Sequence, residues 1–475
     1  MRGWVALVPL LGACGPADPD QARVALIRDT LTNDNAVWMA RDHALLQGKY
    51  AKMAADPFDF VRGSSALYYA DLTRPDPDRA ATGFLSVVDA NAVLLAGDPH
   101  PENFATTLPG DGTATLDPAS LDVELNDLDG SGFGPYLLDV RRAGLGLGTL
   151  AKKLEGCDDA CVEGAVGALA GAYVDEVGVR DAGGATPAAC SDDGRIVAAL
   201  CDRAAEDGTH AAVLDQYSVA ADGARRFVLD ATVDDAGKGL LALGVDESAQ
   251  LDRLLASWTA RPADFRELDR ARRYGSGVAS FPAVRYVVLW DHGGAGPDDD
   301  GAVSIREVVD PPNLSGRGAA VPVLFDSNAA RIEEVAWLLW SRTDADPRMA
   351  GLADGASTFK VTTWSGSFQG FDHDDIAQGW ADGDYVAADL EGLATRIGRT
   401  LAGSHARALT SSGGPALPAI AADLGDGRDS FVAELVADAA VDLARSEADR
   451  ALFIEALEAY GPLLGADTPV DDATR

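Results

Sequence analysis

Residues 93–140 decide the fold, and they read VLLAGDPHPENF over 93–104, TATLDPASLDVEL over 113–125 and NDLDGSGFGPYLLDV over 126–140. Two apolar runs, 93–95 and 121–125, have the length and composition of short strands. Asp98 follows the first run, and Asp127 and Asp129 follow the second at the start of a glycine-rich turn. The pattern therefore predicts carboxylates at the ends of two strands, where a hard cation or a phosphate group would bind.

Asn103 follows Asp98 by five residues. This Asp-x-x-x-x-Asn spacing is that of a kinase catalytic loop, in which the aspartate accepts a hydroxyl proton and the asparagine holds Mg²⁺. A later aspartate at a strand end would then hold the metal between nucleotide phosphates. A calcium loop that starts at Asp127 is disfavoured, because its twelfth position is Leu138 where an EF-hand needs glutamate.

The composition is that of a large, acidic globular protein. The chain has 475 residues, 47% of them hydrophobic, and 75 acidic against 39 basic side chains give a net charge of −36. A chain of this length can bury a large core, and two or three domains are expected. Because such a surface repels polyanions, we expect neither nucleic acid nor anionic lipid as a partner.

The N-terminus resembles a bacterial lipoprotein signal. Met1 and Arg2 precede the apolar run 4–11, and small residues lead to Cys14, which would carry the lipid. Residues 15–22 would form a tether, so we expect an exported protein anchored to the cell envelope only through Cys14. The alternative is an ordinary cytosolic N-terminus.

The other four cysteines fit export. The expected pairing is local, Cys157 with Cys161 and Cys190 with Cys201, as two disulfides. A zinc site is the alternative, although no Cys-x-x-Cys and no nearby histidine pair supports it.

The hydrophobic periodicity divides the chain into successive regions. We expect a signal, a tether, a helical region that carries the Asp/Asn site and a cysteine-containing insert, a glycine-loop β-layer with a helix, and a C-terminal helical region: 1–14, 15–22, 23–270, 271–365 and 366–475.

Several motifs together resemble the bacterial DUF2252 family over about residues 35–460: DPFDFVRG at 56–63, GDPHPENF at 97–104, NDLD at 126–129, YGSGV at 274–278 and HAR at 405–407. The Gly-Asp-x-His-x-x-Asn and Asp-x-Asp motifs of that family are similar to those of aminoglycoside phosphotransferases and other protein-kinase-like enzymes. The resemblance implies an α+β, protein-kinase-like fold that is mostly helical with a small antiparallel β-layer.

The resemblance also implies roles for the site residues. Asp98 would be the general base, Asn103 and Asp127 would be Mg²⁺ ligands, and Asp129 would be an auxiliary ligand. His100 belongs to the catalytic loop, where we expect it to brace the loop rather than to act chemically.

Two further residues are given supporting roles, Arg62 and Asp139, and Asp139 opens the segment DVRR at 139–142, which also resembles the family. Asp139 is expected to hold the catalytic loop through hydrogen bonds. Arg62 is expected either to reach a phosphate or to form a structural salt bridge.

The glycine turn Gly275, Ser276 and Gly277 follows the catalytic motifs by about 170 residues, whereas kinase-like enzymes place their glycine loop first. If the parts are equivalent, the motif order is permuted. Backbone N–H groups of the turn would then cover phosphates. A plain hairpin corner is the alternative.

Arg306 stands where the family has lysine on the strand after this turn. This exchange is not conservative where a compact ammonium fits between phosphates. Glu334 on the next helix is expected to pair with Arg306, and Lys360 on a neighbouring strand is a substitute donor.

Two functions follow from these expectations. The first is a phosphotransferase that uses Mg²⁺ and ATP to phosphorylate the hydroxyl of an unknown small-molecule or protein acceptor. The second is a degenerate kinase-like lipoprotein that binds a ligand or partner without turnover, which the export signal and Arg306 favour.

Overall fold

The computed structural model describes residues 19–72, 92–107, 121–186, 190–207, 210–221, 223–234, 237–291, 293, 296, 300–309, 325–342, 345–366 and 368–466. The predicted signal, Cys14 and the first half of the predicted tether, residues 15–18, lie outside these ranges. The last tether residues, 19–22, are already helical, because they form the first turn of α1 (Pro19–Asp34). None of the helices in the described ranges is both long and apolar enough to cross a bilayer.

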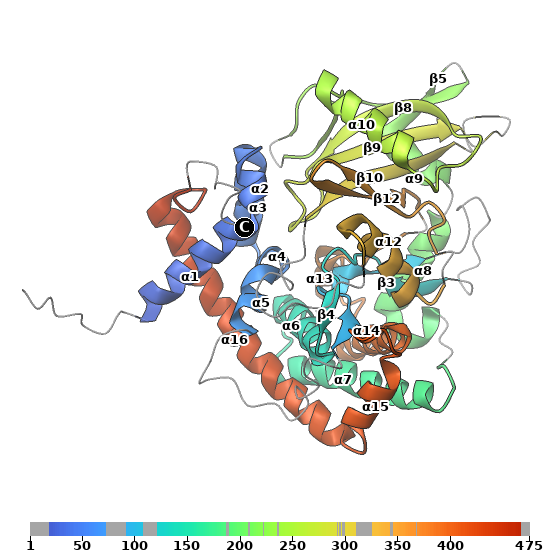
Figure 1. Ribbon diagram of the computed structural model, residues 1–475. Coiled ribbons are helices and arrows are strands. Elements are labelled where there is room, and N and C mark those ends of the chain that lie inside the picture. Colours follow the sequence, from blue (N-terminus) through green and yellow to red (C-terminus); the bar gives the residue numbers. More distant parts are fainter. Residues whose placement is uncertain are drawn as a thin grey trace, which may run out of the picture.

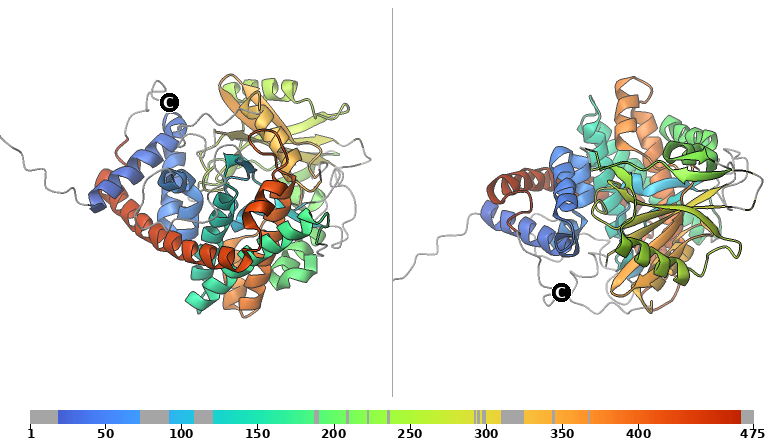
Figure 2. Two further views of the ribbon diagram at one scale, coloured as in Figure 1. Left: turned by 60° about the horizontal axis from the view of Figure 1, so that its bottom comes forward. Right: turned by 90° about the horizontal axis from the view of Figure 1, so that it is seen from above.

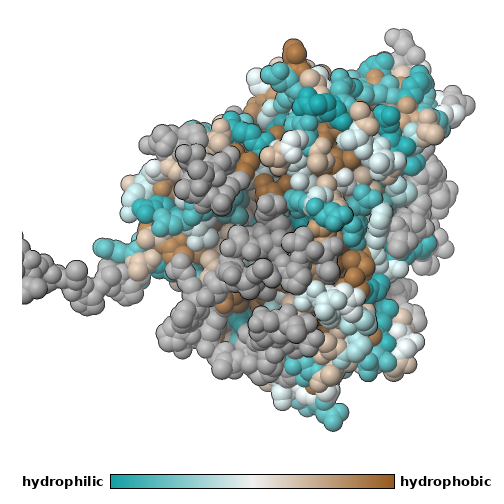
Figure 3. Space-filling view, in the orientation of Figure 1, coloured by the Kyte–Doolittle hydropathy of each residue, from teal (hydrophilic) through white to brown (hydrophobic). Residues whose placement is uncertain are grey.

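A six-stranded antiparallel sheet forms one part of the molecule, drawn in green, yellow and brown at the top of Figure 1. Its strand order is β11-β12-β10-β9-β8-β7. The strands are, in that order, Ala350–Asp354, Ser357–Thr363, Gly301–Val308, Arg285–Asp291, Arg266–Tyr274 and Gly239–Leu241. On the face drawn in Figure 3, hydrophilic residues are spread over this part of the molecule, in keeping with the acidic composition.

Both faces of the sheet are covered, and β9 shows why. Tyr286 and Val288 pack with α10 (Val245–Ser257) on one face. Val287 and Leu289 pack on the other face with Leu214 and Phe227. Because successive side chains of a strand point to opposite faces, a strand covered on both sides is a continuous apolar run, as Tyr286 to Trp290 is.

The predicted region boundary at residue 271 falls inside β8, and β7 joins the sheet still earlier. The sheet therefore begins within the region that the sequence assigns to helices. β8 reads RELDRARRY, and a strand this rich in charge has no apolar run to indicate it.

The helices form the larger part, built around α6 (Leu137–Lys153), α7 (Asp159–Asp181), α14 (Ala387–Arg407) and α16 (Arg428–Tyr460). Every residue of α6 from 137 to 151 is buried. The long α16, red in Figures 1 and 2, packs on α6 and α7 and also reaches α1 and α3 near the N-terminal end. The remaining α-helices of the described residues are α2 (Ala36–Met39), α3 (His43–Ala55), α4 (Pro57–Gly63), α5 (Ser65–Leu72), α8 (Gly194–Glu206), α9 (His210–Tyr217), α12 (Asn328–Leu339), α13 (His373–Ala381) and α15 (Leu417–Leu424).

Buried charge helps to fasten α6 to α16. The Arg141 guanidinium lies 2.9 Å from a carboxylate oxygen of Asp442 and 3.2 Å from one of Asp438. All three side chains are buried, so the ion pairs satisfy one another within the helical core.

Three further antiparallel strand pairs lie within the part of the chain that the structure describes. They are β1 (Val93–Leu95) with β4 (Gly132–Gly134), β2 (Phe104–Thr107) with β3 (Asp122–Leu125), and β5 (Ser218–Ala221) with β6 (Ala224–Phe227). The first two pairs lie between the helices and the six-stranded sheet and carry the predicted site. The fold is thus α+β and mostly helical, as predicted.

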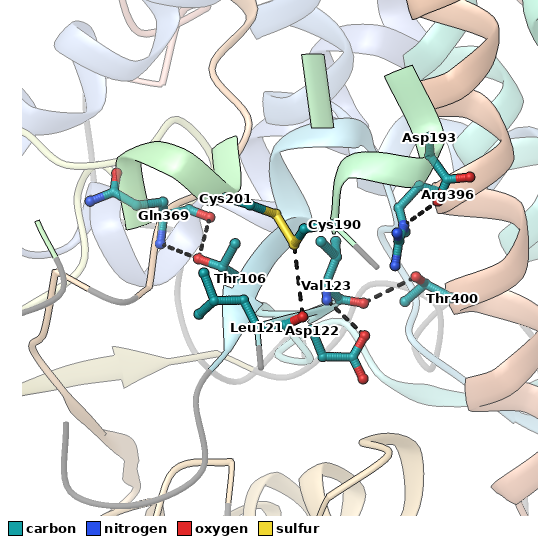
Figure 4. Close-up of a disulfide and its surroundings, with 10 residues drawn as sticks. All are labelled: Thr106, Leu121, Asp122, Val123, Cys190, Asp193, Cys201, Gln369, Arg396 and Thr400. Carbon is teal, nitrogen blue, oxygen red and sulfur yellow. Dashed lines mark hydrogen bonds and ion pairs between the residues drawn. A yellow bond between two sulfur atoms is a disulfide. The ribbon is translucent and has the colours of Figure 1, made fainter. Parts of the chain in front are cut away.

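The four described cysteines form two local disulfides, Cys157–Cys161 and Cys190–Cys201, as predicted. They are not gathered into one zinc site. Figure 4 shows the second disulfide beside the β2–β3 hairpin, where Cys190 Sγ contacts the carbonyl oxygen of Leu121 at 3.8 Å. It ties the short helical turn 190–193 to α8.

Removal of the buried disulfide is expected to cost more stability than removal of the other. Loop-closure entropy predicts a loss of about 3 kcal/mol for the Cys190→Ser/Cys201→Ser variant, and about 2 kcal/mol for Cys157→Ser/Cys161→Ser, whose closed loop is shorter. Urea unfolding of the two variants and the wild type gives both values. The reverse order would show that loop closure is not what these disulfides contribute.

Candidate functional site

The loop after β1 places Asp98 at the junction between the two parts of the molecule. Gly97 has φ +91°, and a side chain at this position would clash with the carbonyl group of Gly130 in the turn after β3. Only glycine adopts this conformation without strain and also permits the close approach. Gly97 therefore allows the loops of Asp98 and Asp127 to approach each other closely.

Asp139 supports this loop through hydrogen bonds, as predicted. Its carboxylate accepts the N–H groups of Ala96 and Gly97 at 2.7 and 3.0 Å. It also lies 3.1 Å from Nε2 of His405, whose Nδ1 lies 2.8 Å from the hydroxyl of Tyr173. These three side chains are fully buried, so the network fixes the backbone of the loop from below.

Asp98 is paired with an arginine from α6. Nε of Arg142 donates to Oδ1 of Asp98 at 2.7 Å, and Nη2 of the same guanidinium donates to the carbonyl oxygen of Val61 at 2.5 Å. Burial raises the pKa of Asp98, and the charge of Arg142 opposes that rise. The second carboxylate oxygen is free of Arg142, so it can accept a proton at the cavity described below.

His100 and Asn103 complete the loop. Nε2 of His100 lies 3.9 Å from Oδ2 of Asp98, and within the described part of the chain its Nδ1 has no hydrogen-bond partner. Burial, followed by the charge of Arg62, holds the pKa of His100 well below its usual range, so the ring is neutral. The side-chain amide of Asn103 donates to the carbonyl oxygen of Asp98 at 2.7 Å, which leaves its own oxygen as a ligand atom.

Asp127 and Asp129 meet two cations from the six-stranded sheet. Nη2 of Arg306 lies 3.0 Å from a carboxylate oxygen of Asp127 and also contacts the carboxylate of Asp129. Nζ of Lys360 lies 3.2 Å from Asp127 and 2.5 Å from Asp129. Arg306 and Lys360 are direct partners across β10 and β12, which is why both reach the same pair of carboxylates.

These cations set the protonation of the cluster. Burial alone would raise the pKa of Asp127, but Arg306 and Lys360 hold it well below its usual range. Asp127 is therefore an anion at neutral pH, as a metal ligand must be.

The glycine turn lies beside this cluster. Gly275 and Gly277 have φ +74° and +79°, which only glycine adopts readily. At the end of the turn, Oγ of Ser280 accepts from Nη1 of Arg306 at 3.2 Å and from Nη2 of Arg285 at 3.4 Å. Burial and the neighbouring Arg306 lower the pKa of Arg285, so another cation would be unfavourable here while an anion would be favourable.

Glu334 is not part of this arrangement, and its predicted pair with Arg306 is not formed. Its side chain is exposed on α12, whereas Arg306 is occupied by Asp127 and Asp129. Arg331, one turn earlier on α12, faces inward and donates to the carbonyl oxygen of Ser131 at 3.0 Å. The helix thus contacts the site through a different residue and a different face.

A cavity of about 230 Å³, here called the central cavity, lies where these elements meet. Most of the residues predicted for the site line it: Asp98, His100, Asn103, Asp127, Asp129, Ser276, Gly277 and Arg306. Gly275 lies outside it, on an adjoining cavity. Arg62 also lines the central cavity, and it forms the structural salt bridge that was one of its two expected roles, to Glu102 at 2.7 Å.

The sequence did not indicate the wall that the N-terminal helices contribute. Lys49 on α3 lines the central cavity, and its Nζ donates to Oδ1 of Asn35 at 2.7 Å. Burial lowers the pKa of Lys49, which is partly offset by Asp34. The sequence pattern could have indicated this residue, because Lys49 is a charged residue on the apolar helix face formed by Leu45 and Leu46.

The fold and site together define a mostly helical α+β protein whose sheet and helices share a cavity lined by paired carboxylates and cations. The chain belongs to the family described as "Uncharacterized protein conserved in bacteria (DUF2252)", which it matches over residues 41–456. No curated protein and no solved structure matches it.

Proposed function

We propose that the protein is a kinase-like phosphotransferase that moves the γ-phosphate of ATP to a hydroxyl group of an acceptor. The observation that carries the proposal is the ion cluster in which Arg306, after the glycine turn, contacts Asp127 and Asp129. Residues about 180 positions apart in the chain thus line one cavity with Asp98. A phosphotransfer site needs these parts together: a general base, metal ligands, a cationic side chain that binds the phosphates, and a glycine turn.

The order of elements in the sheet supports the same proposal. The glycine turn connects β8 to β9, Arg306 lies on the following strand β10, and helix α12 comes next. Kinases have the sequence glycine loop, strand with lysine, then helix αC. In this chain the segment follows the catalytic loop, so we propose a permuted motif order.

The residues present fit a magnesium ion. Asp127, Asp129 and Asn103 offer carboxylate and amide oxygens, the ligand types that Mg²⁺ prefers, and the low pKa of Asp127 keeps that oxygen ready to bind. When bound, the ion would neutralise the negative charge of the phosphates.

The protein's own groups supply the remaining steps. Arg306 and Lys360 now neutralise the two aspartates, and we propose that they turn to the transferred phosphoryl group. Asp98 takes the proton of the acceptor hydroxyl. The hydroxyl oxygen of the acceptor then bonds to the γ-phosphorus of ATP, and the bond between that phosphorus and the leaving ADP oxygen breaks. Neutral His100 holds the loop through its packing on Phe58, at 5.9 Å between ring centres.

One observation favours the second candidate, a protein that binds ligand without turnover. Arg306 contacts both aspartates at once, and a planar guanidinium is harder to displace from two carboxylates than an ammonium. The sequence also predicts export and a lipid anchor on Cys14. Both favour this second candidate, because ATP is scarce outside the cytoplasm.

Thermal unfolding separates ATP binding from no binding. We expect Mg²⁺ with ATP to raise the melting temperature, and Mg²⁺ alone or ATP with EDTA to leave it near the unliganded value. Asp127→Asn should abolish the shift. Asp122→Asn is the matched control, because Asp122 lies on β3, the strand that precedes Asp127, but outside the central cavity. No shift in saturating Mg-ATP would contradict the proposal.

A further inference from the structure

A second and larger cavity adjoins the central one. Its volume is about 910 Å³, and it shares Arg62, Ser276 and Gly277 with the central cavity. The glycine turn therefore borders both spaces. A molecule held in this neighbouring cavity would lie next to the site of Asp98.

An arginine without a counter-ion lines the neighbouring cavity. Arg273 on β8 has its guanidinium carbon 4.8 Å from the ring centre of Trp364 and 5.5 Å from that of Tyr217. Among the described residues it has no ion pair and no side-chain hydrogen bond. Burial lowers the pKa of Arg273, which shows how little the surroundings compensate the charge. Aromatic packing positions the group while its five N–H donors stay available.

A lysine from the helical part lies on the same cavity. Lys52 on α3 donates from Nζ to the carbonyl oxygen of Gly277 at 3.4 Å and lies 4.9 Å from the ring centre of Phe281. Within the described ranges neither Lys52 nor the exposed Lys238 nearby pairs with a carboxylate. Burial lowers the pKa of Lys52, the charge of Asp59 opposes this effect, and the charge of Lys238 adds to it.

The acidic residues of this cavity are, by contrast, already engaged. Asp59 and Glu102 pair with Arg62, and Asp374 pairs with Lys153. The others accept backbone N–H groups, namely Asp230, Asp234 and Asp372. In a chain of net charge −36, a cavity that holds cations with no carboxylate partner among the described residues is an unusual place.

We infer that the neighbouring cavity binds an anionic group, a phosphate or a carboxylate, on the acceptor whose hydroxyl meets Asp98. Arg273 and Lys52 would hold the anion, since guanidinium and ammonium groups both recognise such oxygens through charged hydrogen bonds. The role as acceptor rests on the proposed function, whereas the binding of the anion does not.

The inference is tested without nucleotide or metal. Binding of glycerol 3-phosphate, glycerate and glycerol to the whole protein is measured by calorimetry. We expect the two anions to bind and glycerol not to bind, and the tighter anion identifies the group. Arg273→Gln and Lys52→Gln should each weaken binding about tenfold or more. Arg348→Gln is the matched control, because Arg348 also lies over a tryptophan, 5.3 Å from Trp290, but outside this cavity.

Other results would also bear on the anion site. Equal affinity for glycerol and glycerol 3-phosphate, or equal losses in Arg348→Gln and Arg273→Gln, would overturn the inference. Loss of glycerol 3-phosphate binding in saturating Mg-ATP would also overturn it, because the nucleotide would then fill this cavity. Anion binding in a protein that does not bind Mg-ATP would instead contradict the proposed function and support the anion site.

Discussion

Asp98→Asn is expected to lower the rate of ADP formation from Mg-ATP by about 10²- to 10⁴-fold, the range for loss of a general base. Asparagine has the size of aspartate and still offers an oxygen to Nε of Arg142, which now lies 2.7 Å from Oδ1. It cannot accept a proton as the carboxylate does. ATP affinity should therefore stay near that of the wild type, so that kcat falls while binding does not.

The pH profile gives a second readout of the same variant. Because burial raises the pKa of Asp98, the wild-type rate should decline on the acidic side at a higher pH than an exposed aspartate would give. Asp98→Asn should lack that decline. Asp122→Asn is again the control. Equal loss of rate in the two variants, or loss of ATP binding in Asp98→Asn, would show that Asp98 is not the base.

Asp139→Ala is expected to lower the free energy of unfolding by about 3–5 kcal/mol, because it removes a buried carboxyl group from a hydrogen-bonded network. The N–H groups of Ala96 and Gly97 would lose their acceptor, and His405 would lose its partner. The loss of stability is therefore large, because several buried polar groups lose their hydrogen-bond partners at the same time. Urea unfolding measures it.

Two other variants calibrate this value. Tyr173→Phe removes only the hydroxyl that contacts His405 and should cost about 1 kcal/mol. Asp175→Ala removes an exposed partner of Arg428 and should cost less than about 1 kcal/mol. If Asp139→Ala is no more destabilising than Asp175→Ala, the network does not hold the loop.

Much of the site could be predicted because its parts follow short local patterns. Asp98, Asp127 and Asp129 follow strand-like runs, Asn103 follows Asp98 at the spacing of a kinase catalytic loop, and the structure places all of them on one cavity. The disulfides were predictable for the same reason, since the cysteines of each pair are close in sequence.

The rest depends on which face of an element turns inward. The helix α12 presents Arg331 rather than Glu334 to the β3–β4 turn, and the sequence of the helix alone does not show which. Arg142, Lys49 and Arg285 reach the site from three separate elements, so no spacing connects them with Asp98.

The start of the six-stranded sheet could not be predicted from the local hydrophobic pattern either. β8 is charged along its length, and of its residues only Ala271 and Arg272 are buried. Its place in the sheet is set by pairing with β7 and β9.

Calorimetric titration of ATP in the presence of Mg²⁺ tests most directly whether one nucleotide bridges the two parts of the site. We expect a single ATP site, and chelation of Mg²⁺ by EDTA should abolish the binding. Asp127→Asn, in the loop after β3, and Arg306→Met, on the sheet, should each weaken binding at least about tenfold in variants that still unfold cooperatively. ATP that binds equally well in EDTA, or equally well to Arg306→Met, would contradict a nucleotide that bridges the two parts.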